Sequence, residues 1–154
     1  MRCDTGRRIR LITQDKKKYL PLLLLADEQE DMIDRYLSRG DLYVLEERGK
    51  PIAVCVVTDE GQSRLEIKNL AVEASLQRQG IGKSMIGFIA ERYKDRFHTL
   101  LVGTGDSPLT VPFYEACGFV RSHVVKDFFL RHYDHPFMEG GVLLCDMVYL
   151  KKDI

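Results

Sequence analysis

Apolar residues in this chain alternate with polar residues in some stretches and recur at helical spacing in others. The clearest change of pattern lies near the middle of the chain. Leu65–Val72 is rich in apolar residues, as a buried strand is, whereas the apolar positions that follow recur every three or four residues. The pattern therefore predicts a strand, a polar turn over residues 73–79 and a helix from Gly82 to about Asp95.

Upstream of this strand the pattern predicts three more strands and a helix-loop-helix. The strand-like runs are Arg8–Thr13, Leu42–Glu46 and Ile52–Thr58. Apolar residues share one helical face in Lys16–Ala26 and in Glu28–Arg39, and Gly40 ends the second helix. Short polar turns join the last two of these strands to each other and to the central strand. We therefore expect three successive strands to pair antiparallel.

Downstream, the apolar run His98–Val102 follows the predicted central helix. Because a helix separates this run from Leu65–Val72, the two strands are expected to pair in parallel. A short helix is expected next, beginning after Ser107 or after Thr110 and ending at Gly118, and both starts remain open. The remaining predicted segments are a strand over Phe119–Lys126, an aromatic and charged loop over Asp127–Gly141 and a final strand over Val142–Leu150.

The composition indicates one globular domain over residues 1–154. With 45% hydrophobic and 30% charged residues, the chain is long enough for one core and too short for two ordinary domains. Lys plus Arg and Asp plus Glu number 23 each, so no net charge favours nucleic acid or an anionic membrane. No apolar run approaches the ~20 residues that span a bilayer, and the N-terminal residues lack the apolar centre of a secretory signal. We expect a cytoplasmic protein with neither of these partners.

The four cysteines lie far apart in the sequence. Their spacing does not match that of a metal site, and we expect Cys3, Cys55, Cys117 and Cys145 to be buried free thiols. His132, Asp134, His135 and Cys145 also lack the regular spacing of a structural metal site, so no metal is expected.

Two glycines, Gly80 and Gly82, stand where the predicted central helix begins. The first amides of a helix have no intrahelical acceptor, and glycine lets an anion approach them closely. Lys83 adds a cation beside them. These features favour a phosphate site, and a tight strand-to-helix turn is the alternative explanation.

Two short motifs, each following a predicted strand, point to a known family. Gln77-Arg-Gln-Gly-Ile-Gly82 follows the central strand, and Phe113-Tyr114, with Gly118-Phe119 after it, follows the next strand. This arrangement resembles the GNAT superfamily of acetyl-CoA-dependent N-acetyltransferases from about residue 8 to the end. The resemblance implies an α/β (α+β) fold in which helices flank a mixed, mostly antiparallel central sheet, with acetyl-CoA as co-substrate.

The resemblance also implies a place for each part of acetyl-CoA. The pyrophosphate would bind at the glycine loop and helix start, that is, at Gln77, Arg78, Gln79, Gly80, Gly82, Lys83 and Ser84. The pantetheine arm would lie along Leu70, Ala71 and Val72, with Ser107 and Phe113 also contacting the cofactor. Many members have Asn at the position of Ser107, where a serine still forms hydrogen bonds. Tyr114 holds the position from which relatives protonate the departing thiolate, and a purely packing role is its alternative.

The residue that removes the proton from the acceptor amine is left open by the sequence. A primary amine with a pKa near ~10 is mostly protonated at neutral pH, so a proton acceptor is useful, directly or through water. Glu66 lies at the spacing before Gly80 at which some relatives carry a catalytic glutamate, and it is our first candidate. Glu73 and plain solvent are the alternatives.

The acceptor itself is the least defined part of the prediction. In the family, the acceptor pocket is formed by segments that correspond here to Ala26–Asp31 and Asp127–Gly141, which are acidic and aromatic respectively. A small-molecule amine is the preferred acceptor, ahead of a protein N-terminus or lysine. A non-catalytic acyl-CoA-binding or partner-binding module is the competing class. The sequence leaves open whether the chain forms a homodimer. A dinucleotide-dependent oxidoreductase is disfavoured because antiparallel strands precede the glycine loop.

Overall fold

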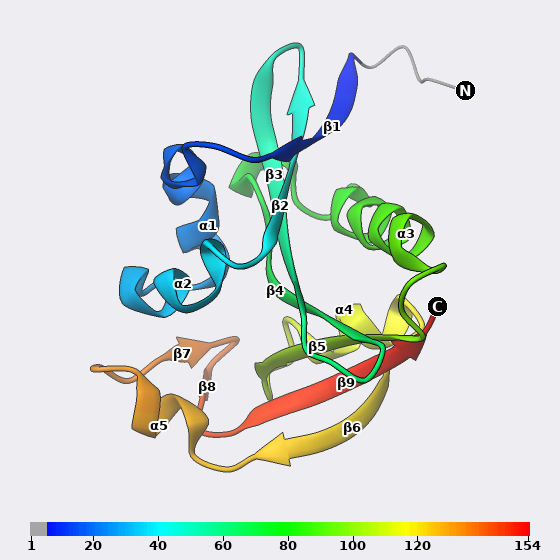
Figure 1. Ribbon diagram of the computed structural model, residues 1–154. Helices are drawn as coiled ribbons and strands as arrows, with labels where there is room; N and C mark the ends of the chain where they lie inside the picture. The colour runs from blue at the N-terminus through cyan, green and yellow to red at the C-terminus, as the bar shows by residue number, and fades with distance from the viewer. Residues whose placement is uncertain (1–5) are drawn as a thin grey trace.

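The computed structural model describes residues 6–154, which form a seven-stranded sheet with helices on both faces (Figure 1). The strand order is β1-β2-β3-β4-β5-β9-β6, and the only parallel pair among the described residues is β4 with β5. The predicted mixed, mostly antiparallel sheet is therefore confirmed. Its strands are β1 (Arg7–Ile12), β2 (Asp41–Glu47), β3 (Lys50–Asp59), β4 (Arg64–Val72), β5 (Thr99–Gly105), β6 (Val120–Val125) and β9 (Met147–Asp153).

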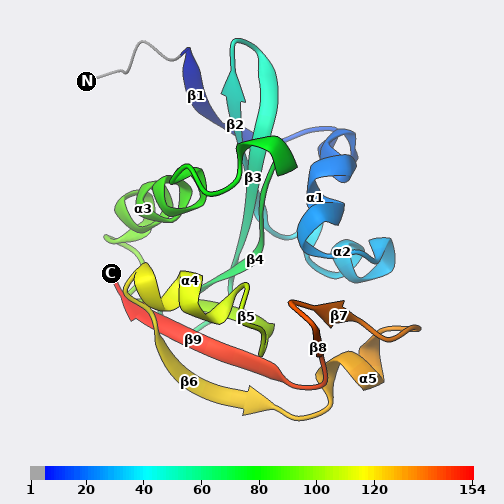
Figure 2. The same ribbon diagram turned by 180° about the vertical axis from the view of Figure 1, so that it is seen from behind.

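The helices divide the buried residues into two clusters, one on each face of the sheet (Figure 2). The short η1 (Lys16–Tyr19) leads into α1 (Leu20–Ala26), and α1 and α2 (Glu30–Leu37) cover one face. The opposite face is covered by α3 (Ile81–Tyr93) and α4 (Val111–Ala116). The other short helices are η2 (Ala74–Leu76), before α3, and α5 (Phe128–His132), after β6.

A bulge in β4 changes which side chains face each cluster. Val56 of β3 pairs with Asn69, but the neighbouring Val57 pairs with Ile67, so Lys68 is an extra residue on β4. Ile67 faces the α3 cluster before the bulge, and Leu70 packs against that cluster after it, whereas Asn69 bonds toward α1. An extra residue in one strand reverses the alternation in this way and increases the local twist.

The parallel pairing of β4 with β5 stops at the same place. Paired residues run from Arg64 with Thr99 to Ile67 with Val102, and the two strands separate beyond Ile67 (Figure 1). The predicted parallel pairing is confirmed, and its early end leaves main-chain groups of β4 without a neighbouring strand on that side.

The short helix α4 settles the choice between its two predicted starts. It begins at Val111, directly after Thr110, with Pro112 in its first turn. Proline is tolerated there because a first-turn amide has no intrahelical partner. The helix ends before Gly118, whose φ of +95° is the left-handed conformation that commonly follows a helix.

The predicted loop over Asp127–Gly141 and the predicted final strand over Val142–Leu150 need correction. The first segment contains α5 and β7 (Met138–Glu139), and the hairpin partner of β7 is β8 (Val142–Leu143). Gly140 and Gly141 both have positive φ, which permits the tight turn between β7 and β8. The buried Leu144 follows β8, and its amide donates to Phe137 O at 2.9 Å. It therefore bonds to the α5–β7 segment and does not belong to the final strand, so β9 starts only at Met147.

The described cysteines differ in how deeply they are buried. Cys55 and Cys117 are buried free thiols as expected, and burial raises the pKa of Cys55 to about 12, whereas Cys145 is only partly buried. Cys3 lies outside the described residues. Within residues 6–154, no helix is both long enough and apolar enough to cross a membrane.

Candidate active site

A cavity of about 670 Å³ opens where β4 and β5 separate. Its wall includes the glycine loop before α3, the face of α4 and the two strand ends, and it continues to the α1–α2 connection and the α5–β7 segment. The two segments expected to form the acceptor pocket therefore lie on the wall of the same cavity as the glycine loop.

The glycine-loop end of the cavity is built from the main chain. Gly80 has a φ of +83°, and a Cβ added there would meet no atom within 4 Å, so the space beside it is open. The first helical bond of α3 is the one that Ser84 N donates to Gly80 O, at 3.0 Å. The amides of Ile81, Gly82 and Lys83 precede this bond, and together with the helix dipole they suit a phosphate group.

Two residues of the motif have local structural roles. A Cβ added to Gly82 would lie 3.1 Å from Cζ of Phe113, so glycine is needed here for α3 to pack close to α4. The side-chain amide of Gln77 donates to Val72 O at 3.1 Å and ties the loop to the end of β4. Neither contact was predicted from the sequence, where Gln77 was linked to cofactor binding and the alternative for Gly82 was a tight strand-to-helix turn.

The structure separates the predicted cofactor residues into two groups. Those that line the cavity are Leu70, Val72, Gln77, Arg78, Gly80, Gly82, Phe113 and Tyr114. Those that do not line it are Ala71, Gln79, Lys83, Ser84 and Ser107. Among the latter, Ala71 packs in the α1–α2 cluster and the amide of Ser84 is already used in the helix. The hydroxyl of Ser107 accepts a bond from Leu109 N at 3.0 Å.

Tyr114 lines the cavity and packs against the rings of Phe113 and Phe119. The ring centroids are 5.0 Å and 5.6 Å from that of Tyr114, in edge-to-face contacts that hold the side chain in place. It is only 8% exposed, and burial raises its pKa above the ordinary value for tyrosine. The phenol therefore stays protonated at neutral pH and is available as a proton donor.

The two candidate bases lie outside the cavity wall. Glu66 is 6% exposed and forms an ion pair with Lys68, Nζ to Oε2, at 3.0 Å, and it is Lys68 that lines the cavity. Burial raises the pKa of Glu66, and the nearby ammonium of Lys68 partly opposes this shift. Glu73 is absent from the cavity wall, and its carboxylate accepts a hydrogen bond from Ser75.

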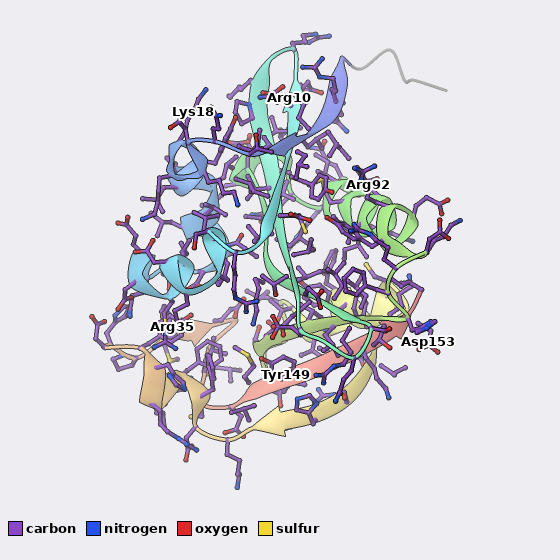
Figure 3. All side chains as sticks on the ribbon, in the orientation of Figure 1. Arg10, Lys18, Arg35, Arg92, Tyr149 and Asp153 are labelled. Atoms are coloured by element: carbon purple, nitrogen blue, oxygen red, sulfur yellow. The ribbon has the colours of Figure 1, made fainter. Side chains whose placement is uncertain are left out.

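The opposite end of the cavity is built from side chains that are far apart in the sequence. Asp27, after α1, accepts hydrogen bonds from the hydroxyls of Tyr133 at 2.7 Å and Tyr36 at 3.2 Å. Burial raises the pKa of Asp27, and these two hydrogen bonds oppose the shift. Glu139 of β7 also lines this end, with a pKa raised by burial. Arg35 of α2 lies near Tyr133 and is labelled in Figure 3.

Asp27, Tyr133 and Glu139 belong to the two segments expected to form the acceptor pocket, whereas Asn69 was not predicted to line it. Asn69 is 3% exposed and lines the cavity from the bulged part of β4. An asparagine inside an apolar strand is the one signal that marked it in the sequence. Glu139 reaches the cavity because it lies on the short hairpin of β7 and β8.

The part of the chain from residue 6 onward holds no group of three His, Cys, Asp or Glu side chains placed to bind a metal ion. One cavity brings together the main-chain amides at the start of α3, a neutral phenol and a carboxylate-lined end. These features fit a phosphate-bearing acyl carrier at one end and a second substrate at the other.

Comparison with known proteins identifies the class to which this fold and site belong. Residues 38–121 match the family model described as an acetyltransferase (GNAT) domain. The chain belongs to the GNAT family, and it is an acetyl-CoA-dependent N-acetyltransferase.

Several individual relatives resemble the chain over nearly its whole length. It is 37% identical over 149 residues to YvbK, an uncharacterized N-acetyltransferase of Bacillus subtilis strain 168, and 96% of each chain is covered. A GNAT family acetyltransferase from Elizabethkingia anophelis, solved with acetyl-CoA bound, has a TM-score of 0.91 at 31% identity, covering 97% of this chain and 99% of that one. An IAA acetyltransferase from Bacillus cereus ATCC 14579 has a TM-score of 0.89 at 34% identity, covering 96% and 99%.

Proposed function

We propose that this enzyme transfers the acetyl group of acetyl-CoA to the primary amine of a small molecule, with both substrates bound at once. The observation that carries the proposal is the single cavity that joins the main-chain anion site to the end lined by Asp27 and Glu139. A shared cavity favours direct attack by the amine over a covalent enzyme intermediate, because both reactants reach one space.

In this proposal the protein holds acetyl-CoA mainly through its main chain. The amides from Gln79 to Lys83 bind the pyrophosphate, and the unpaired edge of β4 from Leu70 to Val72 binds the pantetheine arm. Bound acetyl-CoA supplies an activated acetyl group and a thiolate leaving group. The open space beside Gly80 supports this assignment, since a side chain there would occupy it.

Tyr114 and Glu66 move protons in this scheme. Tyr114 donates the proton of its phenol to the leaving sulfur, and its raised pKa keeps that proton in place until then. Glu66 accepts the proton of the amine through an ordered water, because its carboxylate lies behind the cavity wall. Burial raises the pKa of this carboxylate, which makes it a stronger proton acceptor than an exposed glutamate.

The closure of the acceptor end supports a small molecule over a protein surface. The hydroxyl of Tyr133 bonds to Asp27, and Asp134 N donates to Oε1 of Gln29 at 3.3 Å. These bonds join the α5–β7 segment to the α1–α2 connection. In both views α2 lies beside the β7–β8 hairpin (Figures 1 and 2). A protein terminus would need this connection to open.

The test is an acetyl-transfer assay on a panel of acceptors. The panel contains small aliphatic and aromatic amines, a peptide with a free N-terminus, a lysine peptide and IAA, after which the B. cereus relative is named. Release of CoA thiol is followed by absorbance, and products are identified by mass spectrometry. Acetylation of small amines above the peptides supports the proposal, and acetylation of the peptides alone refutes it.

A further inference from the structure

The side chain of Asn69 has one half of its amide satisfied and the other half free. Its Nδ2 donates to Leu23 O at 3.0 Å and to the hydroxyl oxygen of Tyr36 at 3.1 Å. Its Oδ1 is buried and has no hydrogen-bond partner in the described structure. A buried acceptor without a donor is costly, so such a group calls for a ligand or another donor.

The orientation of this amide follows from its partners. The carbonyl oxygen of Leu23 is an acceptor only, so it must face the NH2 of Asn69 and not its Oδ1. The same carbonyl accepts the backbone amide of Asp27 at 3.1 Å. Asn69 and Asp27 therefore share one hydrogen-bond acceptor, the carbonyl oxygen of Leu23 in α1, and both residues line the cavity.

Asp27 brings a negative charge that no cation neutralises within the described structure. Its hydrogen-bond donors are the hydroxyls of Tyr36 and Tyr133 and the backbone amide of Gln29, none of which is a cation, and no ion pair of the described residues includes it. Glu28 and Glu139 line the same end and add to the negative potential. These three carboxylates are not matched by ion pairs in the described part of the chain, since Arg35 lies near Tyr133 without an ion pair to Asp27 and Lys68 on the cavity wall is paired with Glu66.

An aromatic wall lies beside this charge. The rings of Phe129 and Tyr133 stack with centroids 5.5 Å apart, and Phe137 meets Tyr133 edge-on at 4.8 Å. All three residues line the cavity. Such rings pack against apolar groups and attract cations through their faces.

We propose that Asp27 and the free carbonyl oxygen of Asn69 bind the protonated amine of the acceptor, and that Phe129, Tyr133 and Phe137 contact an apolar or aromatic group next to it. An ammonium has several N–H donors and one positive charge, so it satisfies the unpartnered oxygen and the unneutralised carboxylate together. A neutral alcohol satisfies at most one of them, and a carboxylate is repelled. The inference rests on the proposed function and names the chemistry that selects its substrate.

The test uses 2-phenylethylamine as the probe and 2-phenylethanol as its uncharged counterpart. Binding to the CoA-loaded protein is measured by calorimetry for the parent, for Asp27→Asn and for Asp95→Asn. Asp95 is exposed just after α3 and does not line the cavity, so its variant makes the same change in net charge outside the site. We expect Asp27→Asn to weaken amine binding about tenfold or more, the magnitude of losing a charge-assisted hydrogen bond. Asp95→Asn should leave amine binding unchanged, and neither variant should change alcohol binding.

Two outcomes would overturn the subsite. One is equal amine affinity in the parent and in Asp27→Asn, and the other is a parent protein that binds the alcohol as tightly as the amine. A crystal structure with amine and CoA gives a direct check, because the nitrogen should contact Asn69 Oδ1, and a water alone on that oxygen contradicts the inference. Acetylated product in the parent with no effect of Asp27→Asn refutes this subsite while leaving the proposed function standing.

Tyr133→Phe provides a second variant that keeps the packing of the ring. The hydrogen bond from Tyr133 lowers the pKa of Asp27, so its loss should raise that pKa further. Amine affinity should then decline at a higher pH on acidification than in the parent, whereas a structural role alone would leave this midpoint in place. The other groups that act on Asp27 are Tyr36, the backbone amide of Gln29 and the charge of Asp31, and all of these stay in place in this variant.

Discussion

The two ends of the cavity are built in different ways. The end near α3 presents main-chain amides of a loop and helix start, which follow one another in the sequence. The end near α5 presents side chains of Asp27, Asn69 and Tyr133, which come from three separate parts of the chain. A main-chain site recognises any phosphate, whereas a side-chain site depends on the identity of each residue. The first end therefore suits a shared cofactor and the second suits a particular acceptor.

The largest expected effect is the loss of CoA binding in Gly82→Leu. The added side chain would meet Phe113, since even a Cβ would lie 3.1 Å from its ring, and it would crowd the amides at the helix start. We expect CoA affinity to fall by a factor on the order of a thousand, measured by calorimetry.

The matched control for this change is Gly87→Leu, in the same helix. A Cβ at Gly87 would meet no atom within 4 Å, so the fold and CoA affinity should both be retained. A folded Gly82→Leu protein with parental CoA affinity would contradict a main-chain phosphate site at this end. Circular dichroism of both variants shows whether the fold is kept, because crowding against Phe113 also strains the α3–α4 contact.

The next effect is on turnover and concerns Tyr114, which lines the cavity. Tyr114→Phe keeps the ring contacts with Phe113 and Phe119 and removes only the proton donor. We expect kcat to fall roughly ten- to a thousandfold while acetyl-CoA affinity changes little. Steady-state kinetics and equilibrium binding separate the two quantities. A loss of affinity at unchanged kcat would assign Tyr114 a packing role.

A smaller effect is expected from Glu66→Gln and shows itself as a change in pH dependence. If Glu66 takes the proton of the amine through water, the variant should be slow at neutral pH and recover as the free amine accumulates at higher pH. Glu73→Gln, measured beside it, tests the alternative base. Coinciding pH profiles of the parent and Glu66→Gln would exclude Glu66 as the base.

The contrast between the two ends also explains how much could be predicted from the sequence. Strands β1 to β6, the parallel pair and the joint of strand, loop and helix depend on short-range patterns, so they were predicted and confirmed. The start of β9 was not, because it depends on Leu144 packing against Gly105 and bonding to Phe137. Asn69 was missed for a similar reason, since its partners Leu23 and Tyr36 lie at sequence separations of 46 and 33 residues. Contacts of this length leave no periodic signal in the chain.

The smallest expected effect concerns the stability cost of the charged acceptor end. Burial raises the pKa of Asp27 in the folded protein above its value in the unfolded chain. Between these two pKa values the folded protein binds more proton than the unfolded chain, so the free energy of unfolding falls as the pH rises through this window. Above this window the carboxylate is ionised in both states, and its burial destabilises the fold relative to a neutral side chain. Asp27→Asn should therefore raise the melting temperature above the window, and this gain should shrink as the pH falls into the window, where the parent carboxyl takes up its proton. Thermal melts of the parent, Asp27→Asn and the exposed control Asp95→Asn across a pH series measure the difference. A parent that loses stability relative to Asp27→Asn on acidification would reverse the sign of this argument and show that the tyrosine hydroxyls more than compensate for the burial of the charge.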